Sequence, residues 1–309
     1  MISRPAFRLT LALLVLAPVT RAQELLSPAE FLGYDWERGR LDTSPHPFTS
    51  GTQFDARITT RYDEANPLDA LTATIHEYGH ASYQLGLPRD EYGTPLGSPR
   101  FEVHESQSRF WENHVGRTRA FWETFLPTFQ AQLSGVDDLT VEEVYAAANR
   151  VYPENTIRVY ADELTYHMHI ILRHEIEQEY LQGALAVDDV PDRWNEVMDQ
   201  YLGVVPEDDA HGPLQDIHWT GRFGGFPSYT IGSVLAAQLT AAMREDLDVE
   251  GCIRDEAFGK LREWMGEHVH RHGQRYPADE LVEVATGEPL TADHFVDYAT
   301  EKFGDLYGL

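Results

Sequence analysis

Apolar positions along the chain mostly follow the 3.6-residue period of amphipathic helices, and clusters of turn residues separate the helical stretches. Strand-like alternation is confined to a short piece between residues 54 and 60. No internal repeat, low-complexity tract or Gly/Ser-rich or Pro-rich linker divides the chain. The pattern predicts a mainly α protein with a small β-sheet, in which residues 23–309 form one domain.

A first long helix is predicted to run from Pro67 to Gly86. Asn66 is a favourable N-cap residue, and a proline suits the first helical turn. Gly86 and the following Pro88 are typical stop signals.

A second helix is predicted to begin at Ser98-Pro99 and to continue to about Leu126, with Pro127 as its stop. The loop at residues 88–97 is short, so we expect the two helices to pack as neighbours.

The composition is that of a globular protein with an unusual charge. Of 309 residues, 42% are hydrophobic and 11% aromatic, while the net charge is −27 and only two of the 24 basic residues, Lys260 and Lys302, are lysines. The surface is therefore halophile-like, although an acidic protein from a high-GC genome without salt adaptation is the alternative. The charge argues against nucleic acid or an anionic membrane as a partner.

The cysteine count and the N-terminal segment favour different cellular locations. Cys252 is the only cysteine, which excludes an intramolecular disulfide and is compatible with a cytoplasmic protein. Residues 1–22 resemble a signal peptide, with Arg4 and Arg8 before a short apolar run that ends at Ala22. We expect either an export signal or a non-native start.

The stretch HEYGH, residues 76–80, lies in the middle of the first predicted helix. Residues four apart project from one helix face, so His76 and His80 can bind one metal ion with Glu77 beside them. Catalytic zinc takes three protein ligands and keeps one position open. Glu77 is expected to act as the general base that takes a proton from the water attacking a peptide carbonyl. The motif predicts a zinc peptidase site.

Glu105, on the second predicted helix, is the candidate for the third metal ligand. Its neighbour His104 points about 100° away on a helix, so only one of the two can face the metal. We favour Glu105 as the ligand and expect His104 to form a hydrogen bond with a nearby carboxylate.

Several separate motifs in one order give the chain a family resemblance. It resembles the thermostable carboxypeptidase Taq family, which are gluzincin metallopeptidases, from about residue 35 to the C-terminus. The motifs are His46-Pro47-Phe48, Asp55-Ala56-Arg57-Ile58-Thr59, residues 76–80, residues 104–109, Ile157-Arg158 with Ala161-Asp162-Glu163, residues 212–219, residues 226–229, and residues 270–273 with Tyr276.

The resemblance implies a zincin-like helical fold around a deep groove, with the small sheet beside the active-site helix. It also implies a zinc or cobalt ion, a homodimer, and cytoplasmic turnover of peptides with broad specificity. Tyr160 departs from the family, which usually has an acid at this position. Members also carry a further N-terminal portion that forms one wall of the groove, and the chain is expected to lack it.

A carboxypeptidase must recognise a free C-terminal carboxylate, and the planar fork of an arginine suits this task. With the family match, the candidates are Arg158 and Arg275. Tyr276 and His218 are candidates for stabilising the oxyanion, although His218 can equally form a packed pair with Trp219.

Other residues in and near these motifs are expected either to line the substrate groove or to support the fold. Tyr229 is a candidate for the groove wall. Asp55 and Arg57 are expected to pair and hold the sheet, and the histidines at 268, 270 and 272 are interpreted as structural.

The sequence therefore predicts a zinc carboxypeptidase. The nearest enzymatic alternative is a gluzincin endopeptidase or dipeptidase with the same metal chemistry. An alternative from another class is a non-catalytic fragment that keeps the metal without turnover. Peptides with free and amidated C-termini would separate the first two.

Overall fold

The computed structural model describes residues 27–63, 65–221 and 223–309. The signal-like segment at residues 1–22 lies outside the described residues. Within the described part of the chain, no helix combines the length and the apolar composition that a membrane span requires.

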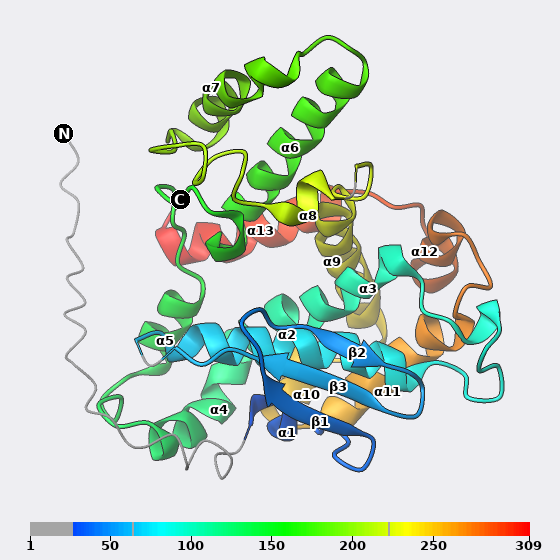
Figure 1. Ribbon diagram of the computed structural model, residues 1–309. Coiled ribbons are helices and arrows are strands. Elements are labelled where there is room, and N and C mark those ends of the chain that lie inside the picture. Colours follow the sequence, from blue (N-terminus) through cyan, green and yellow to red (C-terminus); the bar gives the residue numbers. More distant parts are fainter. Residues whose placement is uncertain (1–26, 64, 222) are drawn as a thin grey trace.

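The described residues are mostly helical, as the hydrophobic pattern predicts (Figure 1). The α-helices are α1 (Pro28–Phe31), α2 (Pro67–Gly86), α3 (Phe101–Arg109), α4 (Arg119–Gln132), α5 (Val141–Ala148), α6 (Thr165–Leu181), α7 (Val190–Leu202), α8 (Ile217–Thr220), α9 (Ser228–Asp246), α10 (Val249–Arg254), α11 (Phe258–His268), α12 (Ala278–Thr286) and α13 (Asp293–Tyr307). Short 3₁₀ turns are η2 (Pro95–Gly97), η4 (Arg158–Tyr160), η5 (Val187–Asp189) and η6 (His270–His272), and η3 (Phe110–Gly116) is π-helical.

One small sheet lies against α2, the helix that contains the HEYGH motif (Figure 1). Its strands are β1 (Gly39–Thr43), β2 (Thr49–Gly51) and β3 (Ala56–Thr60), in the order β1-β3-β2. β1 runs parallel to β3 and β2 runs antiparallel to it. The prediction of a mainly α fold with a small sheet is confirmed, as is the pairing of Asp55 with Arg57 at 2.8 Å.

The first predicted helix is confirmed at both ends, since α2 begins at Pro67 and ends at Gly86. The side chain of Asn66 makes no capping hydrogen bond, so the start of α2 depends on Pro67 and on burial of the helix. Ile75, Tyr78 and Ala81 form its apolar face and are buried in the main core.

The extent predicted for the second helix is wrong. The chain forms α3 and η3 as one continuous helical stretch, and a separate helix, α4, follows. The break occurs at Thr118, whose side chain accepts a hydrogen bond from the backbone N–H of Phe121 and so begins a new helix.

Pro127 also does not stop a helix, because it lies inside α4, which continues to Gln132. Phe125 and Phe129 follow on the apolar face of α4 and are buried against Trp122. The burial of these rings outweighs the hydrogen bond that the proline removes, since tertiary packing supplies most helix stability.

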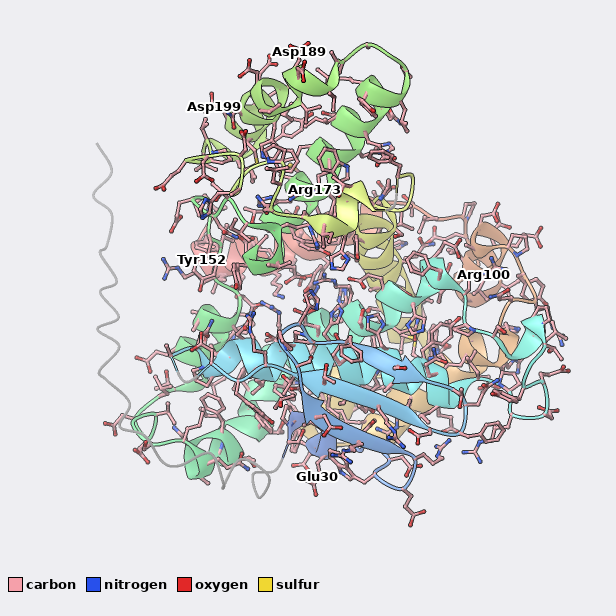
Figure 2. The ribbon with its side chains drawn as sticks, viewed as in Figure 1. Glu30, Arg100, Tyr152, Arg173, Asp189 and Asp199 are labelled. Carbon is pink, nitrogen blue, oxygen red and sulfur yellow. The ribbon has the colours of Figure 1, made fainter. Side chains whose placement is uncertain are left out.

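The buried apolar residues form two clusters. The larger one joins the sheet with α2, α3, α4, α9 and α11, and the smaller one joins α6, α7 and α8 with the start of α9. α6 and α7 project together from the body of the molecule (Figure 1). Figure 2 shows Arg173 of α6 in the interior, where it is fully buried, whereas Asp189 and Asp199 are exposed at the edge of the same lobe.

The C-terminal helix α13 is attached to the body by a buried ion pair. The ammonium of Lys302 lies 2.7 Å from a carboxylate oxygen of Glu163 and 2.8 Å from the hydroxyl of Tyr298. The other oxygen of Glu163 accepts a hydrogen bond from Tyr298 at 2.8 Å. The pairing satisfies charges that burial would otherwise make costly.

Candidate metal site and active site

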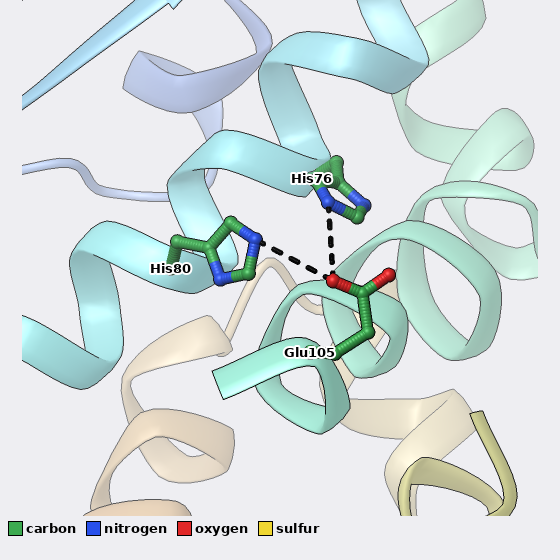
Figure 3. A group of neighbouring side chains, drawn as sticks. All are labelled: His76, His80 and Glu105. Atoms are coloured by element: carbon green, nitrogen blue, oxygen red, sulfur yellow. Dashed lines mark ion pairs between the residues drawn. The ribbon is translucent and has the colours of Figure 1, made fainter. Parts of the chain in front are cut away.

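Helices α2 and α3 bring three potential metal ligands together. Figure 3 shows the imidazoles of His76 and His80 and the carboxylate of Glu105 pointing toward one another. Nε2 of each histidine lies 3.8 Å from the same oxygen, Oε2, of Glu105, and the potential ligand atoms all lie within 4.8 Å of one another. Ligand atoms that each lie about 2 Å from one zinc-sized ion are separated by roughly 3 to 4 Å. The three residues therefore fit a single metal ion.

Two glycines allow the helices to approach closely enough to form this cluster. A Cβ added to Gly79 of α2 would lie 2.5 Å from the carbonyl oxygen of Gln107 and 2.6 Å from Cα of Ser108, both in α3. A Cβ added to Gly232 of α9 would lie 2.5 Å from Cβ of Glu105. Such distances fall below ordinary van der Waals contact, so only glycine fits at these crossings.

Gly79→Ala is expected to destabilise the fold by about 1–3 kcal/mol, because the added methyl group meets backbone atoms that cannot move aside without separating α2 from α3. Gly266→Ala in α11 is the matched control, since nothing lies within 4 Å of the added Cβ. Chelator-treated protein would be unfolded with denaturant. Equal stability of the two variants would contradict the close packing of α2 on α3.

Glu112, in the π-helical segment η3, orients His76. The Nδ1 atom of His76 lies 2.9 Å from Oε2 of Glu112, while Arg109 and Arg117 contact this carboxylate at 3.1 and 2.8 Å. Burial alone would raise the pKa of Glu112, yet the two arginines hold that pKa well below its ordinary value. An ionised Glu112 accepts the Nδ1 proton of His76 and leaves the lone pair of Nε2 directed at the cluster.

His80 is oriented by a second chain of polar groups. Its Nδ1 lies 2.9 Å from Nδ1 of His104, whose Nε2 lies 3.2 Å from the side-chain amide of Gln84. Burial and the neighbouring histidines keep the pKa of His80 well below its ordinary value, and burial lowers the pKa of His104 to about 4. Both rings are therefore neutral at neutral pH. With the Nδ1 proton of His80 donated to His104, Nε2 of His80 is free to bind a metal. His104 thus contacts a histidine rather than the carboxylate expected from the sequence.

Glu112→Gln is expected to weaken metal binding by about 10- to 100-fold, since the substitution removes the charge that fixes the tautomer of His76. Competition with a chromophoric chelator would measure the dissociation constant. Glu102→Gln is the matched control, because Glu102 lies on α3 with its side chain half exposed. An unchanged dissociation constant in Glu112→Gln would contradict this role.

Glu77 lies beside the cluster and contacts the sheet. Its Oε2 accepts a hydrogen bond of 2.6 Å from the hydroxyl of Thr49 in β2, and only 6% of the residue is exposed. Burial raises the pKa of Glu77 above its ordinary value, although the charge of His76 and the bond from Thr49 oppose the shift. A carboxylate with a raised pKa next to a metal site is suited to general-base catalysis near neutral pH.

His218 and Tyr229 both line one cavity of about 360 Å³. His218, at the start of the short helix α8, is exposed, and its ring centroid lies 5.7 Å from that of His46. Trp219 is buried against Trp194, so His218 and Trp219 do not form the packed pair considered above.

Arg158 lies in a buried cluster of charges near this cavity. Its Nε and Nη2 donate to the two oxygens of Asp216 at 2.5 and 3.2 Å, and its third nitrogen lies 3.4 Å from the hydroxyl of Tyr166. Arg173 contacts the same carboxylate at 3.2 Å. Two guanidinium groups therefore share one carboxylate, which leaves one positive charge unbalanced within the three groups.

Arg275 and Tyr276 lie in the loop before α12. Arg275 is exposed, whereas Tyr276 is half-buried against the main core and its ring centroid lies 5.3 Å from that of His272. Among the described contacts, none joins either residue to the His76–His80–Glu105 cluster. Their catalytic and binding roles remain predictions.

Two of the three histidines interpreted as structural from the sequence, His268 and His270, contact other side chains. His270 lies 2.9 Å from the side chain of Gln107, and the ring of His268 stacks on Trp264.

Sequence reasoning missed several residues that orient the ligands. Glu112, Arg109 and Arg117 were not assigned a role, although Arg109 lies four residues after Glu105 and pairs with it at 2.8 Å. That spacing is a signal for a contact on one helix face. The contact of Glu112 with His76 spans 36 residues and depends on how α2 packs, so no local signal reveals it.

The model of a protein family described as carboxypeptidase Taq (M32) metallopeptidase matches residues 18–303. Among curated relatives, Carboxypeptidase 1 of Bacillus subtilis (strain 168) is 42% identical over 281 residues, which cover 89% of this chain and 56% of the relative. Thermostable carboxypeptidase 1 of Thermus thermophilus is 42% identical over 291 residues, covering 93% of this chain and 56% of the relative. The chain spans about half the length of the curated relatives it matches.

Solved structures agree with these matches. The crystal structure of M32 carboxypeptidase from Deinococcus radiodurans R1 is similar with a TM-score of 0.86 and 45% sequence identity, and the similarity covers 91% of this chain and 58% of that chain.

Proposed function

The chain belongs to the carboxypeptidase Taq (M32) metallopeptidase family, and from this premise we propose that it is a zinc-dependent carboxypeptidase that removes C-terminal residues from peptides. The observation that carries the proposal is the convergence of His76, His80 and Glu105 within 4.8 Å, with Glu77 beside them. Family membership implies a metal, and the choice of zinc is our own inference.

The donor set supports zinc. Two imidazoles and one carboxylate form a three-ligand set that is typical of catalytic zinc and that cobalt also accepts. When bound, the metal would supply Lewis-acid chemistry, polarising a peptide carbonyl and acidifying a water molecule.

Within the chain, Glu77 would take the proton from the attacking water and later deliver it to the leaving amine. Its hydrogen bond from Thr49 fixes the orientation of the carboxylate, and its raised pKa makes it a better base. His218 and Tyr276 remain the proposed donors to the developing oxyanion. His218 has the stronger support, since it lines the cavity next to Tyr229.

The substrate carboxylate would be attracted by the unbalanced positive charge of Arg158 and Arg173 around Asp216. The guanidinium carbon of Arg158 lies 5.1 Å from the centre of the Phe226 ring and 5.3 Å from that of Tyr229, and both of these rings line the cavity. Arg275 is the alternative, supported by its exposure and by the resemblance.

The proposal is tested with peptide pairs that differ only in a free or amidated C-terminus, assayed with metal-loaded protein. A charged hydrogen bond to the carboxylate contributes about 1.5–3 kcal/mol, so amidation is expected to lower kcat/KM by roughly 10- to 150-fold. Equal cleavage of the two peptides would instead favour an endopeptidase.

We also propose a homodimer that acts on peptides in the cytoplasm, as the family resemblance implies. The single cysteine, Cys252, is buried and is compatible with a reducing compartment. Light scattering of the purified chain would measure the oligomeric state, and a monomer at micromolar concentration would contradict the dimer.

A further inference from the structure

Tyr166, in the first turn of α6, is a buried tyrosine that contacts two arginines of the site. The guanidinium carbon of Arg109 lies over its ring, 4.5 Å from the ring centre, and its hydroxyl accepts a hydrogen bond of 3.4 Å from Nη1 of Arg158. Only 7% of the residue is exposed, and burial raises the pKa of the hydroxyl to about 12. The hydroxyl is therefore neutral at neutral pH, as this contact with an arginine requires.

Asp162 fixes the turn of helix from which Tyr166 projects. One oxygen of this buried carboxylate accepts hydrogen bonds from the backbone N–H groups of Leu164 and Thr165, both at 2.9 Å, and the other accepts one from the hydroxyl of Thr165 at 2.6 Å. The backbone N–H of Tyr166 donates to the carbonyl of Asp162 at 3.0 Å. These bonds satisfy N–H groups that the start of a helix would otherwise leave unpaired, so Tyr166 begins from a well-defined place.

The ring of Tyr166 supports the arginine behind the metal ligands. Nε of Arg109 lies 2.8 Å from Oε1 of Glu105, and its Nη1 lies 3.1 Å from Oε2 of Glu112. The other oxygen of Glu105 is the one that faces the two histidines of the cluster. A guanidinium forms hydrogen bonds in its plane and packs on aromatic rings with its face. The ring can therefore restrain Arg109 without competing for either carboxylate.

The hydroxyl of Tyr166 contacts the arginine that is proposed to attract the substrate carboxylate. Nε and Nη2 of Arg158 donate to Asp216, and the remaining nitrogen, Nη1, donates to Tyr166. The guanidinium is thereby held on two sides. Tyr166 thus joins the arginine that contacts a candidate metal ligand to the arginine of the carboxylate-attracting cluster.

We propose that Tyr166 is a positioning residue that fixes Arg158 relative to the candidate metal ligands, so that a bound peptide places its last peptide bond beside them. The inference rests on the proposed carboxypeptidase function and adds to it a residue that acts through Arg158 and Arg109. Removal of one terminal residue requires a constant separation between the group that binds the terminal carboxylate and the reacting centre. Misplacement by about 1 Å can cost roughly 10²-fold in rate, so this separation has to be held by the fold.

Tyr166→Phe tests the proposal, because it removes the hydroxyl and keeps the ring. Tyr145→Phe is the matched control. Tyr145, in α5, is 6% exposed, and the guanidinium carbon of Arg119 lies 4.4 Å from the centre of its ring. Arg119 pairs with the exposed residues Glu142 and Asp305. Each substitution deletes one hydroxyl from a buried tyrosine beneath an arginine, so both variants are expected to fold.

Metal-loaded proteins would be assayed with N-blocked peptides that differ only in a free or amidated C-terminus. Tyr166→Phe should lower the free-to-amidated ratio of kcat/KM by about 2- to 10-fold, mainly through a higher KM for the free peptide. Tyr145→Phe should keep the ratio of the unaltered chain. A general loss of structure would lower the cleavage of both peptides and leave the ratio as it was. An unchanged ratio in Tyr166→Phe would therefore overturn the proposal.

Tyr166→Leu removes the ring as well and tests the link to Arg109. Its metal dissociation constant, measured by chelator competition, is expected to rise by about threefold or more, because leucine offers no aromatic face to the guanidinium. Tyr166→Phe keeps that face and should keep the metal affinity of the unaltered chain. Equal dissociation constants in the two variants would contradict the link.

A binding measurement separates this inference from the proposed function. Calorimetry with N-acetyl-phenylalanine and its amide should show tighter binding of the free acid, and Tyr166→Phe should reduce this preference by about 2- to 10-fold. If that reduction is found without hydrolysis of any peptide, the role of Tyr166 stands and the proposed activity fails. If free peptides are cleaved and Tyr166→Phe keeps the full preference, the activity stands and the role of Tyr166 fails. Equal binding of the acid and the amide to the unaltered chain would also overturn this role.

Discussion

Glu77→Gln is expected to lower kcat by about 10²- to 10⁴-fold while the metal remains bound, because an amide cannot accept the proton that general-base catalysis requires. The substitution preserves the size of the side chain and its ability to accept the hydrogen bond from Thr49. The proposed ligands, His76 and His80, are untouched. Turnover of a C-terminally free peptide and the metal content by atomic absorption would be measured on the same preparation.

Asp69→Asn is the control for this substitution. Asp69 also lies on α2 and pairs with Arg61 at 3.2 Å, but both side chains are more than a third exposed, and such surface pairs contribute little. Its turnover should stay near that of the unaltered chain. Turnover of Glu77→Gln within tenfold of the unaltered chain would assign the base to another residue.

Glu105→Ala is expected to abolish stable metal binding and, with it, activity. The substitution removes one of three candidate ligands and leaves only the two histidines of α2. It also removes the partner that Arg109 contacts at 2.8 Å, although Arg109 keeps its contact with Glu112. Metal content after dialysis against a weak chelator should fall from one equivalent to near zero.

His104→Ala gives the sharpest comparison, because His104 is adjacent in sequence and contacts His80 instead of joining the cluster. We expect it to retain metal with an affinity lowered by about 10- to 100-fold, as for other residues that orient a ligand. Stoichiometric metal in Glu105→Ala, together with loss in His104→Ala, would reverse the assignment.

Local signals in the sequence predicted both ends of α2 correctly. Pro67 and Gly86 mark the ends of α2 because a proline without an N–H suits the first turn and a glycine suits the end of a helix. Pro127 misled the prediction, because the buried aromatic residues of α4 outweigh a local stop signal. β1 and β2 were missed because they are short and exposed, and their pairing with β3 supplies the regular structure.

The same distinction applies to the candidate site. His76, Glu77 and His80 are recognisable because all three lie within five residues of one helix, and Glu105 follows on the next helix. Thr49, by contrast, reaches Glu77 from a strand 28 residues away. Such contacts exist only after distant segments pack, so helical periodicity cannot reveal them.

The buried ion pair of Lys302 with Glu163 has a practical consequence for chemical conjugation. Lys302 is 9% exposed and its ammonium is held by two partners, so it is a poor nucleophile toward amine-reactive reagents. The sequence contains one other lysine, Lys260, which is exposed on α11. Activated esters should therefore attach a dye or a solid support to one lysine only, on a helix that contributes no residue to the metal cluster or to the cavity.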